Sequence, residues 1–90
     1  MARDELADAS DHLESAADET DSDAAAERLG ELADQLDRLA TADRGPDHGR
    51  LARIQSAIDE VRSGDGADVA EALDAADDRI DDYRADLEGV

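Results

Sequence analysis

The apolar residues of the chain recur at helical spacing in four separate stretches. Within each stretch they lie three or four positions apart, which is the repeat of one face of an α-helix. The four sets are Leu6, Ala9, Leu13 and Ala16; Ala25, Leu29, Leu32, Leu36 and Leu39; Leu51, Ile54, Ile58 and Val61; and Val69, Leu73, Ala76, Ile80, Tyr83 and Leu87. Each set forms a narrow stripe, and none alternates with a period of two, so the pattern predicts four amphipathic helices and no strands.

The segments between the stripes carry residues that end and begin helices. Thr20-Asp21-Ser22-Asp23 offers several capping oxygens, Gly45-Pro46 ends a helix, and Ser63-Gly64-Asp65-Gly66-Ala67 reads as a tight turn. Asp68, with Glu71 three residues later, resembles a capping box. These signals place the helices at about 3–19, 23–42, 48–62 and 68–87.

The short connections favour antiparallel neighbours, so the first two helices form one hairpin and the last two form another. The predicted fold class is all-α: an antiparallel four-helix bundle made of two helical hairpins, in a single domain over residues 1–90. Few residues larger than Ala are available for the core, and the Ala-lined stripes would let helices approach closely. A homo-oligomer, most simply a dimer, is therefore expected.

The strongly acidic composition of the chain bears on the salt concentration in which it folds. It has nineteen Asp, eight Glu and nine Arg, no Lys, one aromatic residue and a formal charge of −18. Such a composition fits either a disordered chain or a protein adapted to molar salt. The helical periodicity favours salt adaptation, because a Debye length of about 3 Å at molar salt screens repulsion between surface carboxylates.

Several classes of protein are excluded by the sequence. The chain has no Cys and no apolar run long enough to span a membrane, and its first residues lack the apolar core of a signal peptide. The expected location is therefore cytoplasmic, with no membrane partner. Nine Arg against twenty-seven acids, with no aromatic pair for base stacking, argue against a nucleic-acid partner.

One central segment departs from the acidic composition. Between Arg38 and Arg53 there are four Arg, two Asp and one His, which give that segment a charge of about +2. Arg44, His48, Arg50 and Arg53 flank the predicted turn before the third helix, where guanidinium groups and free backbone N–H groups could bind an anion or an acidic partner. The alternative is that these residues only pair with carboxylates of the same bundle.

No catalytic, metal or cofactor site is predicted. The Ser and Thr residues look like surface or capping residues without an adjacent base, and the Asp-rich turns lack the ligand series of a calcium loop. The sequence thus favours a non-catalytic interaction or structural protein of a halophile cytoplasm, with a protein partner contacting the central loop. The alternative is a regulatory protein that binds a small anion or nucleotide through the Arg-rich central loop.

The central segment also carries a resemblance. Residues 42–53 read ADRGPDHGRLAR and resemble the signature of a family of short haloarchaeal proteins of unknown function. The ending, Asp82-Tyr83-Arg84 with Glu88-Gly89-Val90, is similar to that family's tail, so the similarity extends over the whole chain. The resemblance implies a halophilic cytoplasmic setting and no particular activity.

The spacing of acids on the last helix predicts that folding depends on salt. Asp74, Asp78 and Asp82 are four apart, as are Asp77 and Asp81, and each such pair destabilises a helix by about 0.2–0.5 kcal/mol when unscreened. We expect helicity and melting temperature, followed by circular dichroism, to rise from dilute buffer to molar KCl. Unchanged values across that range would contradict adaptation to salt.

Overall fold

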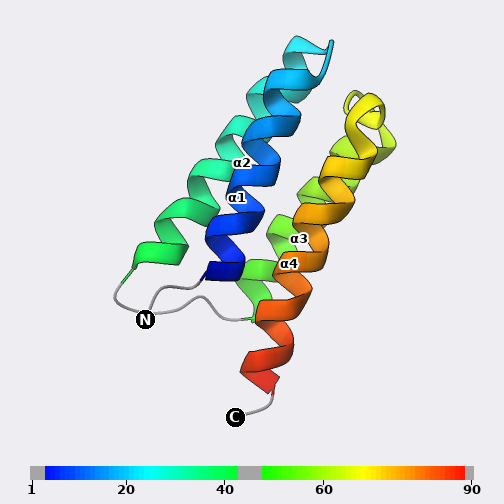
Figure 1. Ribbon diagram of the computed structural model, residues 1–90. Helices are drawn as coiled ribbons and strands as arrows, with labels where there is room; N and C mark the ends of the chain where they lie inside the picture. The colour runs from blue at the N-terminus through cyan, green and yellow to red at the C-terminus, as the bar shows by residue number, and fades with distance from the viewer. Residues whose placement is uncertain (1–3, 43–47, 89–90) are drawn as a thin grey trace.

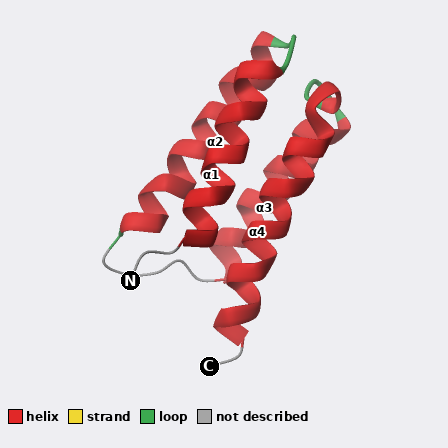
Figure 2. Cartoon of the chain, in the orientation of Figure 1, coloured by secondary structure: helices red, strands yellow, loops and turns green. Residues whose placement is uncertain are grey.

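The computed structural model describes residues 4–42 and 48–88, and all of its regular elements are helical (Figures 1 and 2). The helices are α1 (Asp4–Glu19), α2 (Asp23–Thr41), α3 (His48–Ser63), the short 3₁₀ turn η1 (Ala67–Val69) and α4 (Ala70–Glu88). The predicted all-α class is confirmed, and the predicted boundaries agree with the structure to within two residues at each helix end.

The four helices form a bundle of two hairpins, as predicted. Figure 1 shows α1 beside α2 and α3 beside α4, in a body whose principal dimensions are 40 × 19 × 17 Å. The backbone of α1 approaches α2 and α4 closely, whereas α2 and α3 approach each other at few places. Small residues on α1, such as Ala9 and Ala16, allow this close packing, while α3 presents larger Ile and Leu side chains.

The core is made by the predicted stripes with a few additions. Leu6, Leu13, Leu29, Leu36 and Leu73 are completely buried. Leu39 and Tyr83 are only partly buried against the core, and the side chain of Leu87 lies outside the described part of the structure. The residues that the stripes did not include are small: Ser10, Ala33, Ala40 and Ala57.

Ser10 provides the one buried polar contact between α1 and α2 among the described residues. Its hydroxyl donates to the carbonyl oxygen of Ala33 at 2.7 Å, and only 1% of the residue is exposed. A residue of this size lets the two backbones approach, and the hydrogen bond offsets the loss of water at the hydroxyl.

Two of the predicted turn features are present. Ser22 caps α2 by accepting a hydrogen bond from the backbone N–H of Ala25 at 3.1 Å. Between α3 and η1, Gly66 is buried, and a Cβ atom there would collide with the side chain of Val61. Glycine is therefore required at this position by close packing; its φ of −97° needs no glycine.

Asp68 does not act as the predicted capping box. Its carboxylate accepts hydrogen bonds from the Thr20 hydroxyl and from the Asp21 backbone N–H, each at 2.8 Å. These bonds join η1 to the α1–α2 turn and hold the two hairpins together at one end of the bundle. The sequence suggested a local hydrogen bond within a capping box. The carboxylate instead accepts from Thr20 and Asp21, which precede it in the chain by 48 and 47 positions.

The packing at Ser10 predicts a strict size limit. Ser10→Leu should lower the free energy of unfolding by about 1–3 kcal/mol, because a larger side chain would push α1 and α2 apart. Ser10→Ala should lower it by about 0.5–1.5 kcal/mol, through loss of the hydrogen bond. Ser15→Leu, at an exposed position of the same helix, is the control and should stay within about 0.5 kcal/mol of wild type. Equal losses at both positions, in denaturant titrations in molar KCl, would disprove the size limit.

The bonds at Asp68 predict a pH-dependent contribution to stability. The Asp21 N–H, and then the Thr20 hydroxyl, lower the pKa of Asp68 below its ordinary value. The contribution is therefore fully present above the unfolded-state pKa and is lost as the pH falls through the lower folded-state pKa.

Asp68→Ala should consequently be less stable than wild type at neutral pH, and the difference should shrink in acid below the usual titration range of aspartate. Asp11→Ala removes the same charge from an exposed helix residue and serves as the control. Thermal melts of the three proteins across pH measure the effect. A difference between wild type and Asp68→Ala that does not change with pH would refute it.

Candidate functional site

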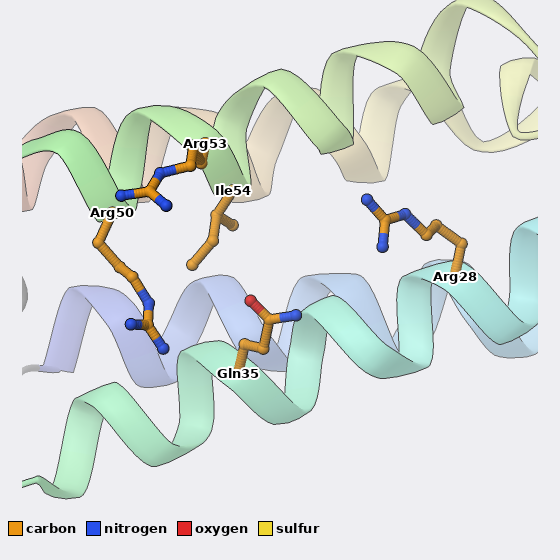
Figure 3. Close-up of a pocket in the computed structure, with 5 residues that line it drawn as sticks. All are labelled: Arg28, Gln35, Arg50, Arg53 and Ile54. Atoms are coloured by element: carbon orange, nitrogen blue, oxygen red, sulfur yellow. The ribbon is translucent and has the colours of Figure 1, made fainter.

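An open groove runs between α2 and α3, where the two helices pack least closely. Part of it has a volume of about 400 Å³ and is lined by Arg28, Gln35, Arg50, Arg53 and Ile54 (Figure 3). We call this part the arginine groove. Gln35 and Arg28 come from α2 and the other three residues from α3, so two segments separated in the sequence build its walls.

The guanidinium groups of the arginine groove come from both of its walls. Figure 3 shows Arg50 reaching from α3 toward α2 and Arg28 reaching from α2 toward α3, with Gln35 between them. Arg50 and Arg53 are three residues apart and therefore lie on the same side of α3. Three of the nine Arg of the chain thus line one groove, together with an amide that can both donate and accept hydrogen bonds.

Arg28 and Arg53 differ from the arginines that connect the helices. Arg62 on α3 binds Asp74 on α4 at 2.7 Å, and Arg79 on α4 binds Asp8 on α1 at 2.9 Å. Arg28 instead makes a long contact of 3.7 Å with Glu31 of its own helix. The Nε of Arg53 donates to the carbonyl oxygen of Gly49, also in its own helix, at 3.4 Å. Both contacts are weak by their length, so they leave guanidinium hydrogens directed to the groove or to solvent.

The electrostatics of the groove change along its length. No carboxylate is among the five residues that line the arginine groove, although the chain has three times as many acids as arginines. Toward the other end of α3, the space between α2 and α3 is lined by Glu60 and Asp65, and Glu27 and Glu31 line the adjoining part of α2. The exposed edge of the α2–α3 pair is therefore basic at one end and acidic at the other.

The described residues of the predicted site do not all lie on the same side of α3. Arg50 and Arg53 lie together in the arginine groove, and Arg44 lies outside the described residues. His48 belongs to the α3–α4 side: its Nδ1 accepts a hydrogen bond from the Nε of Arg84 at 3.1 Å. Since that nitrogen uses its lone pair for Arg84, the imidazole serves as an acceptor that holds the start of α3 to α4.

Gln55 is the centre of the polar contacts between α3 and α4. Its amide nitrogen donates to carboxylate oxygens of Asp77 and Asp81, each at 2.9 Å, and its amide oxygen accepts from Arg84 at 2.7 Å. Partial burial raises the pKa of Asp77, partly offset by the Gln55 hydrogen bond, and the neighbouring Asp81 raises it further. These hydrogen bonds connect α3 to α4 and have a structural role, and an open depression of about 440 Å³ lies over them.

Arg28 and Gln35 are the groove residues that the sequence did not single out. They lie seven positions apart on α2, beside the apolar stripe, and Glu31 lies between them at helical spacing. The spacing of these three residues could have identified them as a group. Residues that flank the core stripe of a bundle helix lie at the edge that faces a neighbouring helix. Their charge gave no signal, since Arg28 stands alone in an acidic segment.

Metal-ligand clusters and membrane spans are both absent from the described residues. In the ranges 4–42 and 48–88, no group of three or more His, Asp or Glu side chains could hold a metal ion. Among the helices that the structure describes, none is long and apolar enough to cross a membrane. The arginine groove is a candidate binding site because it gathers three guanidinium groups between α2 and α3.

Comparison with known proteins gives one result. No curated protein and no solved structure matches the chain significantly. A family of unknown function, DUF7553, matches residues 1–86, which include the segment that the sequence analysis singled out. Because this match covers nearly the whole sequence, the chain belongs to the DUF7553 family.

Proposed function

We propose that this chain is a non-catalytic interaction protein of a high-salt cytoplasm and that the arginine groove contacts the acidic groups of a protein partner. One observation carries the proposal: three guanidinium groups line a groove without a carboxylate, in a chain of charge −18. A partner's carboxylates could accept paired N–H donors from the guanidinium groups, which is the geometry in which Arg binds carboxylates most strongly.

High salt restricts what such a groove can bind well. Where the Debye length is about 3 Å, only groups in direct contact retain a substantial electrostatic attraction. Direct contact is favoured when apolar surface is buried along with the charge, and the groove offers the aliphatic parts of three Arg side chains for this purpose. A helix or loop of a protein satisfies both requirements, because it brings carboxylates and apolar groups together.

The second candidate is a regulatory protein that binds a small anion or a nucleotide in the same groove. Its volume of about 400 Å³ is within the usual range for small-molecule sites, and the Gln35 amide could pair with a polar ligand group. The openness of the groove to solvent favours a protein surface over a ligand that must be enclosed. Both candidate functions use Arg50 and Arg53, so one double variant at these positions tests both functions.

The double variant Arg50→Ala/Arg53→Ala should lose binding while remaining folded, because both residues are exposed. The probes are a labelled helical peptide with Glu at every third or fourth position, inorganic phosphate and ATP, each titrated in molar KCl. We expect the peptide to bind wild type and to bind the variant roughly tenfold more weakly or worse, as loss of charge-assisted hydrogen bonds would cause. Thermal stabilisation by phosphate or ATP alone, lost in the variant, would select the second candidate.

Arg38→Ala is the matched control. Arg38 is also on α2 and its side chain is 79% exposed, but it contacts Asp34 at 3.8 Å and is not among the residues lining the groove. Its replacement removes the same type of charge and should leave binding of each probe unchanged. If Arg38→Ala weakens binding by as much as each Arg removed in the double variant, the groove has no specific role and net charge alone explains the result.

A further inference from the structure

We propose that the partner of the α2–α3 face is a second copy of this chain, docked antiparallel about a two-fold axis that passes near Ala57. The inference rests on the proposed function, since it names the acidic groups that the arginine groove receives. It comes from the order of charges along α3, which makes the face complementary to itself.

The side of α3 that borders the groove is basic in its first half and acidic in its second. Positions 50, 53, 57, 60 and 64 follow one another at steps of three and four and so form one stripe. The stripe begins with the exposed Arg50 and Arg53 and ends with the exposed Glu60, followed by Asp65 just beyond the helix. Ala57, the smallest side chain in the helical part of the stripe, lies at its midpoint.

A two-fold axis at that midpoint pairs opposite charges. In a symmetric dimer the same patch is used by both chains, and an antiparallel arrangement places the start of one α3 beside the end of the other. Arg53 then lies opposite Glu60 of the second copy, and Arg50 lies opposite Asp65 of the second copy. Each of these pairs occurs twice. Ala57 itself is only 7% exposed, so the two copies meet at the axis through the exposed side chains of Arg53 and Glu60 on either side of it.

The bundle as a whole is large enough for such an interface. The bundle is 40 Å long and 19 Å wide, and a standard protein interface buries about 800 Å² on each partner. Arg28 of α2 adds a third guanidinium group beside the stripe, and Ile54 and Val61 lie beneath it. Ile54 and Val61 are only 3% and 8% exposed, so the aliphatic parts of the Arg side chains supply most of the apolar surface between the charged groups of this face.

Salt should strengthen this dimer. Each chain carries a charge of −18, so two chains repel one another over long distances in dilute buffer. Molar salt removes that repulsion, whereas guanidinium and carboxylate groups in direct contact lie within the Debye length of about 3 Å and keep much of their attraction. We therefore expect a lower dimer dissociation constant in molar KCl than in dilute buffer.

The pairing can be tested by exchanging the charges of Arg53 and Glu60. Arg53→Glu alone would place Glu opposite Glu, and Glu60→Arg alone would place Arg opposite Arg. Each variant should raise the dimer dissociation constant by roughly a hundredfold, as like charges at an interface do. An equimolar mixture of the two variants restores both opposite-charge pairs across the interface and should form a heterodimer with an affinity close to that of wild type.

The measurement is sedimentation velocity in molar KCl over a range of protein concentrations, with circular dichroism to verify that each variant is folded. Arg53 and Glu60 are seven residues apart on one helix, too far for a direct pair within the chain, so recovery on mixing can only arise between chains. A monomeric wild type, or single variants that stay monomeric when mixed, would overturn the dimer. In that case retained binding of the acidic peptide through Arg50 and Arg53 would still support the proposed function.

Discussion

The close packing of α1 against both α2 and α4 is the interaction on which the rest of the bundle depends. Ala9, Ser10 and Ala16 are buried on α1, and their small side chains allow neighbouring backbones to approach on two sides. Dispersion contacts fall off steeply with distance, so a helix of small residues stabilises its neighbours only when it lies this close. With α2 and α4 both held to α1, the position of α3 is determined by the larger side chains that it inserts between them.

This arrangement explains why the two sides of α3 differ. On the α4 side, the hydrogen bonds of Gln55 and the ion pair of Arg62 with Asp74 connect the helices through polar side chains. On the α2 side, an open groove lined by residues of both helices, among them Gln35 and Arg53, remains between α2 and α3. The same helix therefore has one side that contacts α4 through polar side chains and another that borders the open groove proposed as the binding site.

Much of the fold could be predicted from the sequence because it depends on local signals. The period of the apolar residues gave the helices, and Ser22 and Gly66 stand at the helix ends for reasons that the residue types reveal. The role of Asp68 could not be predicted, because its donors at Thr20 and Asp21 are distant in the sequence and become neighbours only in the folded bundle. The boundary signals were correct there, but the assigned hydrogen bonds were wrong.

The candidate site was predictable to the extent that its residues share one helix. Arg50 and Arg53 were identified by local charge and by their spacing, whereas Arg28 and Gln35 join them only because α2 packs beside α3. His48 was grouped with the arginines by proximity in the sequence, yet its position at the start of α3 directs it to Arg84 on the opposite side. A helix turns by about 100° per residue, so two residues are enough to move a side chain from one face to another. Neighbours in the sequence of a helical bundle are therefore poor guides to a shared site, and residues at steps of three and four are better ones.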